Sequence, residues 1–517
     1  MTNAMTDNSP EYILYNGNFI TMDDEQETCK AVAIKDGRII TTYHDDKSEI
    51  KRGFQTKLID LDGKTVLPGL IDCNVHLIQG GLQKYCIEVY ADTKEEFLEK
   101  LSDEITRFEN DEWVWCVGYN DTLEELTRWD LDKVSVTHPI VISKTEFHIT
   151  IVNTLAYRLL QIPISVTGTK RDDNGVPTGA LGGEASGFAR RKLFVNLVSD
   201  SLRNRILEEM DHELIANGIT TVNAMEGGPF FADRDIYAAN KYIDNSTVDI
   251  LLFPQTMDVN IATDHQLRRI GGNIYLDGSI RSKTAAILTN YRDESHNGIL
   301  YYSQEDVDTF ILSAHSRGLQ IAISCIGTRA IEQALNSFET AFRIAGKNHH
   351  RHRLELFVLP TEEQIKRAID LDLIFSMRPN YDKLYAQKGG AYEQTIGERR
   401  KQCNPLASII KAGGIICCGS EHSVTPLNPF MSIEACVLHN QKKERLSVYE
   451  ALKSYTVNAA YANFAEGRIG KIKVGYDADL IVISEDLFRV QKEDIGKIRT
   501  LMTMKRGKIV YHERGGL

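Results

Sequence analysis

Residues 66–77 read Val66-Leu67-Pro68-Gly69-Leu70-Ile71-Asp72-Cys73-Asn74-Val75-His76-Leu77. The Pro-Gly pair indicates a turn, and the apolar run that follows it indicates a short buried strand. Alternate side chains of a strand lie on the same face. We therefore expect Asn74 and His76 to share one face, with their polar groups close to the end of the strand.

The composition is that of a soluble globular protein with more than one structural unit. The chain has 517 residues, of which 42% are hydrophobic and 26% charged, and its formal net charge is -12. This acidic balance argues against nucleic-acid binding and against adsorption to anionic membranes. No apolar run approaches the roughly 20 residues of a membrane helix, and the polar start at 1–10 lacks the apolar segment of a signal peptide. The nine cysteines are irregularly spaced, as in free thiols of a reducing compartment. We expect an acidic cytoplasmic protein with a small-molecule substrate and neither a nucleic-acid nor a membrane partner.

The middle of the chain alternates short apolar strands with amphipathic helices, which indicates βαβ units and a parallel sheet. Eight such strands are the number that a TIM-type (β/α)8 barrel needs. The expected strands are Leu70–His76, Thr220–Ala224, Ile250–Pro254, Asn273–Asp277, Gln320–Cys325, Leu354–Val358, Leu373–Met377 and Ile415–Gly419.

Both ends of the chain have a different character, with short strands separated by turn signals such as Asn16-Gly17. We expect a small composite β-sandwich built from residues 1–68 and 466–517, and a barrel over residues 69–465. Residues 78–217 exceed what a minimal barrel needs. We interpret them as an α/β insertion that covers the barrel mouth, where insertions shape the substrate site. The expected fold class is therefore α/β.

The stretch at 66–77 resembles the first barrel strand of the amidohydrolase superfamily, which reads apolar-Pro-Gly-apolar-Ile-Asp-x-His-x-His. Further runs resemble its type 3 branch, which includes N-substituted formamide deformylase, and the similarity extends from about Tyr12 to Tyr511. The resemblance implies the barrel with its flanking sandwich, and a homodimer. The runs that carry it are Phe147–Asn153, Asp173–Gly179, Leu276–Ser279, Ile326–Ala330, Gly419–Glu421, Asn458–Ala460 and Asp477–Leu480.

Most of the family's metal ligands are replaced in this sequence. By resemblance, the ligand positions fall on Asn74, Asn273, Ser324, Leu356 and Glu421, all of them changed, and His76 alone remains as an unchanged ligand type. Zinc needs three or four ligands from His, Cys, Asp or Glu, whereas Asn and Ser oxygens bind transition metals poorly. We therefore expect no metal ligands, and no cofactor such as zinc.

The resemblance implies a hydrolase of non-peptide C–N bonds, of the amide or formamide type, acting on a small polar substrate through a divergent site that is poor in metal or free of it. One alternative is a metal-independent acid–base enzyme on the same fold, such as an isomerase, hydratase or lyase. A second alternative is a binding protein without catalytic activity. The lost ligands favour this second alternative, whereas their replacement by polar groups favours an enzyme.

Carboxylates and histidines expected at strand ends supply acid–base chemistry, because neighbouring carboxylates can be driven apart in pKa. Three of them also have a structural alternative: Glu355 could pair with Arg353 or Arg329, His76 could be a core histidine, and Asp277 could turn the chain. The candidate catalytic residues are Glu421, His76, Asp277 and Glu355, and the candidate substrate-binding residues are Asn74, His148, Asn273, Ser324 and His422.

Overall fold

The computed structural model describes residues 9–44, 52–119, 124–143, 149–163, 166–228 and 233–515. The chain divides into two compact units. The first unit comprises Met1–His76, Glu208–Met225 and Tyr242–Leu517, and the second comprises Leu77–Leu207 and Glu226–Lys241. Among the described helices, none combines the length and the apolar character that a membrane crossing needs.

Eight central strands form the middle of the first unit, in two sheets ordered β16-β15-β8 and β17-β18-β19-β20-β21. All eight predicted strands are confirmed to within a few residues. The β15–β8 ladder and every ladder of the second sheet are parallel. The strands are β8 (Leu70–Val75), β15 (Ile219–Glu226), β16 (Asp249–Pro254), β17 (Arg269–Tyr275), β18 (Gln320–Cys325), β19 (Arg353–Leu356), β20 (Ile374–Met377) and β21 (Ile416–Cys418).

The expected closed barrel is not detected as one hydrogen-bonded ring in the described residues, because the two sheets do not share a ladder. Within β17, the positive φ of Gly271, Gly272 and Asn273 interrupts the regular strand next to β16. A Cβ on Gly272 would lie 2.4 Å from the carbonyl oxygen of Phe253, so the strands approach too closely there for a side chain. Between β21 and β8, a single parallel bridge joins His422 to Val75.

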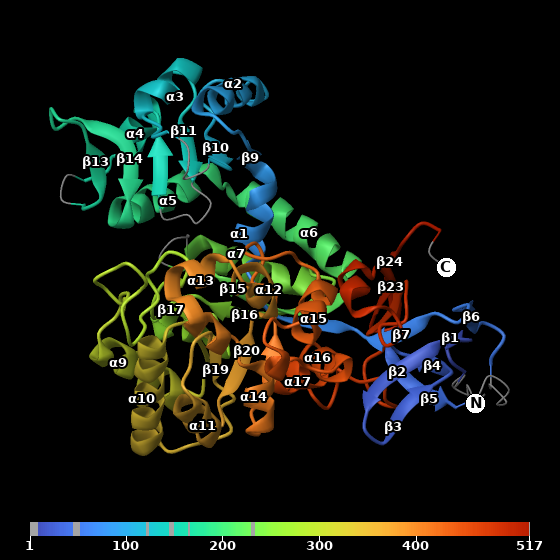
Figure 1. The fold of residues 1–517 in the computed structure, drawn as a ribbon. Helices are drawn as coiled ribbons and strands as arrows, with labels where there is room; N and C mark the ends of the chain where they lie inside the picture. The colour runs from blue at the N-terminus through green and yellow to red at the C-terminus, as the bar shows by residue number, and fades with distance from the viewer. Residues whose placement is uncertain are drawn as a thin grey trace. The chain divides into compact units, whose positions relative to one another are not determined.

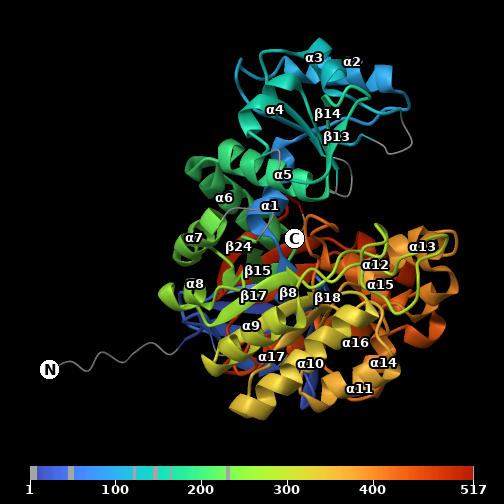
Figure 2. The ribbon, with the colours of Figure 1, turned by 90° about the vertical axis from the view of Figure 1, so that its left-hand side faces the viewer.

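Amphipathic helices cover the central strands. Helices α9 and α10 pack against β18, and α11 packs against α10 (Figure 2). Capping boxes at Ser303 and Thr361 begin α9 and α11, where each hydroxyl accepts a backbone N–H of the first turn. The helices of this unit are α8 (Val259–Asp264), α9 (Gln304–Ser316), α10 (Thr328–Ala345), α11 (Glu362–Asp370), α12 (Pro379–Tyr385), α13 (Ala391–Ile396), α14 (Leu406–Lys411), α15 (Pro429–Val437), α16 (Val448–Ser454) and α17 (Val457–Ala462).

Strands from both chain ends, blue and red in Figure 1, form two further sheets ordered β5-β4-β1-β6 and β24-β23-β22-β7-β2-β3. Leu480 pairs with Pro68 in an antiparallel ladder, so the last part of the chain fixes the strand that leads into β8. The strands are β1 (Tyr12–Tyr15), β2 (Asn18–Asp23), β3 (Gln26–Cys29), β4 (Ala31–Lys35), β5 (Arg38–Tyr43), β6 (Lys57–Asp60), β7 (Thr65–Pro68), β22 (Leu480–Ile483), β23 (Thr500–Lys505) and β24 (Lys508–His512).

The second unit has its own six-stranded sheet, ordered β13-β14-β12-β11-β10-β9, and its own apolar core. That this insertion covers the mouth of the barrel stays a prediction. Helices α6 (Asp200–Ala216) and α7 (Asp233–Tyr242) contribute residues to both units. The other elements are α1 (Leu77–Leu82), β9 (Ile87–Glu88), α2 (Lys94–Ile105), β10 (Val114–Val117), α3 (Arg128–Val134), β11 (Ile140–Ser143), β12 (Ile149–Val152), α4 (Thr154–Leu160), β13 (Thr169–Arg171), β14 (Pro177–Gly182) and α5 (Gly183–Leu197).

Candidate active site

Two arginines and two glutamates, which we call the ion cluster, lie buried among the central strands: Arg353, Glu355, Arg378 and Glu421. Arg353 Nη2 lies 2.7 Å from Glu355 Oε1, and Arg378 Nη2 donates to Glu355 Oε2 at 2.6 Å. Arg378 directly follows β20 and therefore stands at the carboxyl end of that strand. Charges buried to this depth are stable only when they are paired and hydrogen-bonded, as they are here.

Glu421 follows β21 and is held by three side chains from two other segments, β17 and the start of α12. Tyr381 donates its hydroxyl to Glu421 Oε2 at 2.8 Å, and Asn273 Nδ2 donates to Oε1 at 3.2 Å. Arg378 Nε lies 3.6 Å from Oε2. The carboxylate is thus fixed between a phenol, an amide and a guanidinium.

The two glutamates have opposite pKa shifts although both are buried. Burial raises the pKa of each, but the adjacent cations Arg353 and Arg378 outweigh burial at Glu355 and hold its pKa below the usual range. At Glu421, burial prevails over Arg378, and the negative charge of Glu355 adds to it, so the pKa is raised. Two carboxylates driven apart in this way can supply one permanent anion and one group that exchanges a proton.

Short polar side chains surround the ion cluster. Asn74 Nδ2 donates to Glu355 Oε2 at 2.8 Å, and Ser324 is paired with Glu355 in the register of β18 and β19. In the described part of the chain, three oxygens of these neutral side chains are buried and have no hydrogen-bond partner: Asn74 Oδ1, Asn273 Oδ1 and Ser324 Oγ. Glu355 Oε1 has none either, although it forms the ion pair with Arg353. Such orphaned atoms are uncommon in folded proteins and indicate places where a ligand or water can bind.

His76 lies just beyond β8. Its Nδ1 donates to the carbonyl oxygen of Met225 at 2.7 Å, so this nitrogen carries the proton of the neutral ring and Nε2 is left as the basic nitrogen. Burial lowers the pKa of His76 to about 4, and the positive charge of Arg378 acts in the same direction. The imidazole is therefore neutral near pH 7.

Asp277 is engaged by backbone groups. Its carboxylate accepts the N–H groups of Ala286, Ile326 and Gly327 at 2.8 to 3.0 Å. Burial raises the pKa of Asp277 to about 7 in spite of these hydrogen bonds. The contacts connect the segment after β17 with the loop that precedes α10.

The structure thus brings together four of the candidate site residues, namely Glu421, Glu355, Asn74 and Asn273, with Ser324 beside them. Among the described contacts of Asp277, none reaches the ion cluster. The backbone of His422 accepts the N–H of His76 at 3.0 Å, and His148 lies outside the described residues. The expected pairing of Glu355 with Arg353 is confirmed, whereas Arg329 instead donates to Asn297.

Arg378 and Tyr381 were not among the candidates from the sequence. A signal for Arg378 was present, because an arginine directly after the buried strand Ile374–Met377 has to find an anion. Tyr381 lies in the helix that follows, α12, and its sequence neighbourhood carries no comparable signal.

The residues of the ion cluster do not fit a metal ion. Within the described ranges, no group of three or more His, Cys, Asp or Glu side chains is placed to hold one. The guanidinium of Arg378 lies between the two glutamates, and zinc sites require three or four ligands. We therefore derive no catalytic step through a metal.

Comparison with known proteins places this geometry in context. The chain is 26% identical to the protein YtcJ of Bacillus subtilis (strain 168), over 97% of this chain and 99% of YtcJ. It is 23% identical to the N-substituted formamide deformylase of Arthrobacter pascens, over 98% of this chain and 99% of that protein. Its fold resembles the crystal structure of an uncharacterised metal-dependent hydrolase from Pyrococcus furiosus, with a TM-score of 0.76, 22% identity and coverage of 92% of this chain and 100% of that one.

The prediction of a protein without a metal cofactor is contradicted by these comparisons. The structural neighbour is a metal-dependent hydrolase, and a metal such as zinc is typical of the family. The prediction of no metal was wrong because it rested on the replaced ligand positions. It treated the loss of the family's ligands as the loss of the cofactor. The sequence profile of the Amidohydrolase family matches residues 57–511, and the chain belongs to that family.

Proposed function

We propose that this protein is a hydrolase that cleaves a non-peptide C–N bond, of the amide or formamide type, in a small polar molecule. Membership of the amidohydrolase family supports hydrolysis, and the similarity to a formamide deformylase supports this bond type. The observation that carries the proposal is Glu421, a buried carboxylate of raised pKa at the carboxyl end of a central strand, held by Tyr381 and Asn273. Catalytic groups of barrel enzymes lie at this end of the strands.

Glu421 would move the proton in this reaction. Its carboxylate takes a proton from water as the water oxygen bonds to the carbonyl carbon, and returns it to the nitrogen as the C–N bond breaks. The products are a carboxylic acid, which is formate for a formamide, and an amine, and Glu421 is regenerated. A pKa raised toward neutrality suits a group that both accepts and donates a proton.

The groups around Glu421 would hold the substrate. Arg378 Nε is buried and has no hydrogen-bond partner among the described residues, so its N–H can donate to the oxygen that becomes negative. Asn74 and Ser324 each carry a polar oxygen without a described partner, which can bind the polar substituents of the substrate. Because Glu421 is only 2% exposed, the proposal requires that the residues covering it move apart when the substrate enters.

The test is an assay of purified protein against a panel of N-formyl and N-acetyl amines, with the released amine and acid both quantified. Because the structural neighbour is metal-dependent, the assay is run with and without added Zn²⁺. Glu421→Gln should lower turnover by about 100-fold or more, the contribution typical of a general acid–base group. Glu434→Gln is the matched control, since Glu434 is also buried but contacts Lys383 and Gly496, and none of its described contacts reaches the ion cluster.

Turnover of wild-type protein that survives Glu421→Gln would remove Glu421 from the mechanism. Saturable binding of a panel compound without release of amine or acid would instead favour a binding protein. Calorimetry of Glu421→Gln with the best substrate separates a loss of chemistry from a loss of binding.

A further inference from the structure

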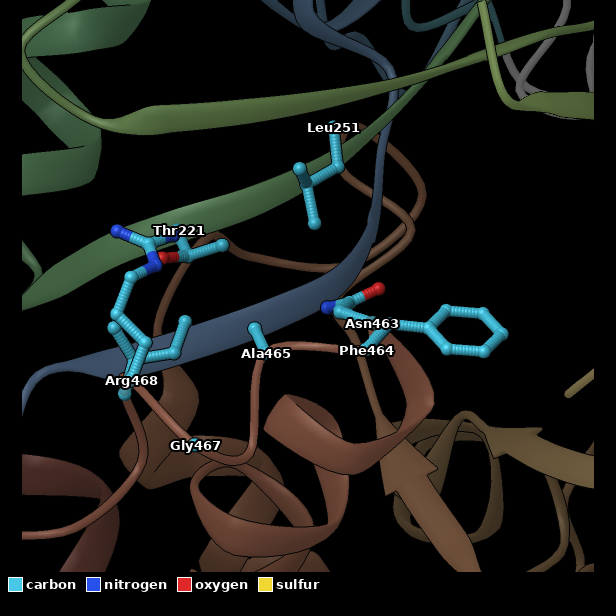
Figure 3. A pocket seen from close by; sticks show the side chains of 8 residues that line it. Thr221, Leu251, Asn463, Phe464, Ala465, Gly467 and Arg468 are labelled. Carbon is cyan, nitrogen blue, oxygen red and sulfur yellow. The ribbon is translucent and has the colours of Figure 1, made fainter.

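A second polar feature lies at the opposite ends of the central strands, and the proposed function makes no use of it. It is a cavity of about 300 Å³, which is at the lower end of the range for small-molecule sites. In Figure 3, Thr221 and Leu251 project from β15 and β16, and Asn463, Ala465 and Arg468 belong to the segment after α17. The remaining lining residues are Phe464, Gly467 and Ile469.

The orientation of the amide of Asn463 is fixed by a chain of hydrogen bonds. Arg353 Nη1 can only donate, so the atom of Asn223 that it contacts at 2.6 Å is the acceptor Oδ1. Asn223 Nδ2 then donates to Asn463 Oδ1 at 3.0 Å. Asn463 must therefore turn its donor, Nδ2, away from Asn223, and this nitrogen has no hydrogen-bond partner in the described residues.

Thr221 provides a second unsatisfied group on the opposite wall. Its hydroxyl is buried and makes no hydrogen bond within the described part of the chain. Thr221 and Asn463 are 1% and 3% exposed, so each is more than nine-tenths buried. A hydroxyl can donate or accept, but an amide nitrogen can only donate, so a ligand that satisfies both groups must bring an acceptor.

The charges beside the cavity favour an anionic acceptor. Arg468 is balanced by Asp249 and Asp477, at 2.9 and 2.6 Å. Arg269 donates to the backbone oxygen of Asn463 at 3.2 Å, and no carboxylate of the described chain lies within ion-pair distance of it. Burial and the neighbouring Arg353 lower the pKa of Arg269 to about 10, as expected for a cation without a counter-ion.

The rest of the cavity wall is apolar. Leu251, Ala465 and Ile469 contribute aliphatic surface, and the ring of Phe464 is 48% exposed although large apolar side chains are usually buried. Phe464 also has a φ of 59°, a conformation uncommon for a residue with a side chain. An apolar body would therefore fit beside the two polar groups.

We propose that this cavity is a binding site for a small monocarboxylate with an apolar body, whose carboxylate accepts hydrogen bonds from Asn463 Nδ2 and Thr221 Oγ1. The site is separate from the ion cluster, and ligand binding there does not depend on the proposed hydrolase activity.

The test measures binding of benzoate to the full-length protein by calorimetry, without any substrate, with benzyl alcohol as the uncharged comparison. We expect saturable binding of benzoate and at least tenfold weaker binding of benzyl alcohol. Thr221→Val should weaken benzoate binding at least fivefold, because it removes one donor and keeps the shape. The matched control is Thr309→Val, an exposed residue of α9 that lines a different cavity, and it should leave benzoate affinity unchanged.

A second variant covers the case in which Thr221→Val does not fold. Ala465→Met places a longer side chain into the cavity from a half-buried position and should abolish benzoate binding. The proposal is overturned if benzoate does not bind saturably up to 20 mM, a limit of about -2.3 kcal/mol in binding free energy, or if a cavity variant binds it as tightly as wild type.

Discussion

The two ends of the central strands both bury polar groups, but they differ in how these groups are paired. At the carboxyl ends, buried charges meet opposite charges, so Glu355 has two arginine partners within 2.7 Å. At the amino ends, Asn463 and Thr221 present polar atoms that no described residue satisfies. Burying polar groups costs free energy unless they are paired. At the carboxyl ends each charged side chain of the ion cluster has a counter-ion, and the atoms left without a hydrogen-bond partner belong to the proposed substrate site. At the amino ends the unsatisfied atoms of Asn463 and Thr221 are neutral and lie in a separate cavity, which indicates a second ligand.

The two ends are also physically connected. Arg353 contacts Glu355 of the ion cluster with Nη2 and Asn223 with Nη1, and Asn223 in turn holds Asn463. A change at either end can therefore reorient the polar groups of the other. Whether the two ends are energetically coupled can be measured with double-mutant cycles.

The largest expected effect comes from breaking the ion cluster. Arg378→Met removes the cation that lies between Glu355 and Glu421. Both carboxylates stay buried and lose this ion-pair partner. We expect a loss of about 3–5 kcal/mol in the free energy of unfolding, measured by denaturant titration. The control is Arg367→Met, whose ion pairs with Glu332 and Glu339 are partly exposed and should contribute less than about 1 kcal/mol. Equal losses in the two variants would contradict the expectation that the buried ion cluster contributes more to stability than the partly exposed ion pairs of Arg367.

The second effect is a pH dependence at His76. Its pKa in the folded protein is lowered to about 4 by burial, whereas an unfolded histidine titrates near 6.5. Between these values the unfolded chain binds the extra proton, so the contribution of neutral His76 to stability is complete above about pH 6.5 and is lost as the pH falls toward 4. The full difference is about 3 kcal/mol.

The measurement compares wild type with His76→Gln by denaturant titration from pH 4 to 7.5. The difference between their free energies of unfolding should decrease as the pH falls through this interval. Burial raises the pKa values of Asp72 and Asp277 to about 6 and about 7, so their contributions to the pH dependence of stability have the opposite sign to that of His76. They are the same in wild type and variant and therefore cancel in the difference. A difference that stays constant with pH would show that His76 is not held neutral by its surroundings.

The strands were predictable from the sequence because local pattern determines them. The run Gln320–Cys325 is apolar and bounded by a glycine, and it forms β18 with those bounds. The family was predictable because many weak motifs occur in order, and the profile match over 57–511 confirms it. The interruption within β17 was not predicted, because an Asn at positive φ in a strand depends on the close approach of another segment.

The site was less predictable than the fold. Glu421 and Asn273 are 148 residues apart in sequence, and only the family resemblance suggested that they meet. The role of Arg378 depends on which anions surround it, which no periodicity of the sequence encodes. The metal prediction was wrong for a related reason: the sequence indicates which ligand types are lost, but not which cofactor a protein of this family uses.

A third, smaller effect is expected where the two ends connect. Asn223→Ala removes the acceptor for Arg353 Nη1 and the donor to Asn463 Oδ1, and leaves both groups buried without those partners. We expect a loss of about 2–3 kcal/mol in the free energy of unfolding. Asn217→Ala is the control, since the one described hydrogen bond of the Asn217 side chain goes to the carbonyl oxygen of Glu213 within its own turn, and it should lose about 1 kcal/mol or less. A similar loss in both would mean that Asn223 does not connect the two ends.

The smallest expected change in stability is at Thr221, in the cavity at the amino ends, because its hydroxyl has no hydrogen-bond partner in the described residues. Thr221→Val removes a hydroxyl that makes no hydrogen bond within the described residues, so the free energy of unfolding should change by no more than about 0.5 kcal/mol in the absence of ligand. The same substitution at Thr503, a buried threonine whose hydroxyl donates to the carbonyl oxygen of Ile215 at 2.6 Å, should cost about 1–2 kcal/mol. If Thr221→Val proves as costly as Thr503→Val, the Thr221 hydroxyl already has a bound partner such as an ordered water. In that case its orphaned state would no longer point to a carboxylate, and the cavity would have to be explained as a hydrated void.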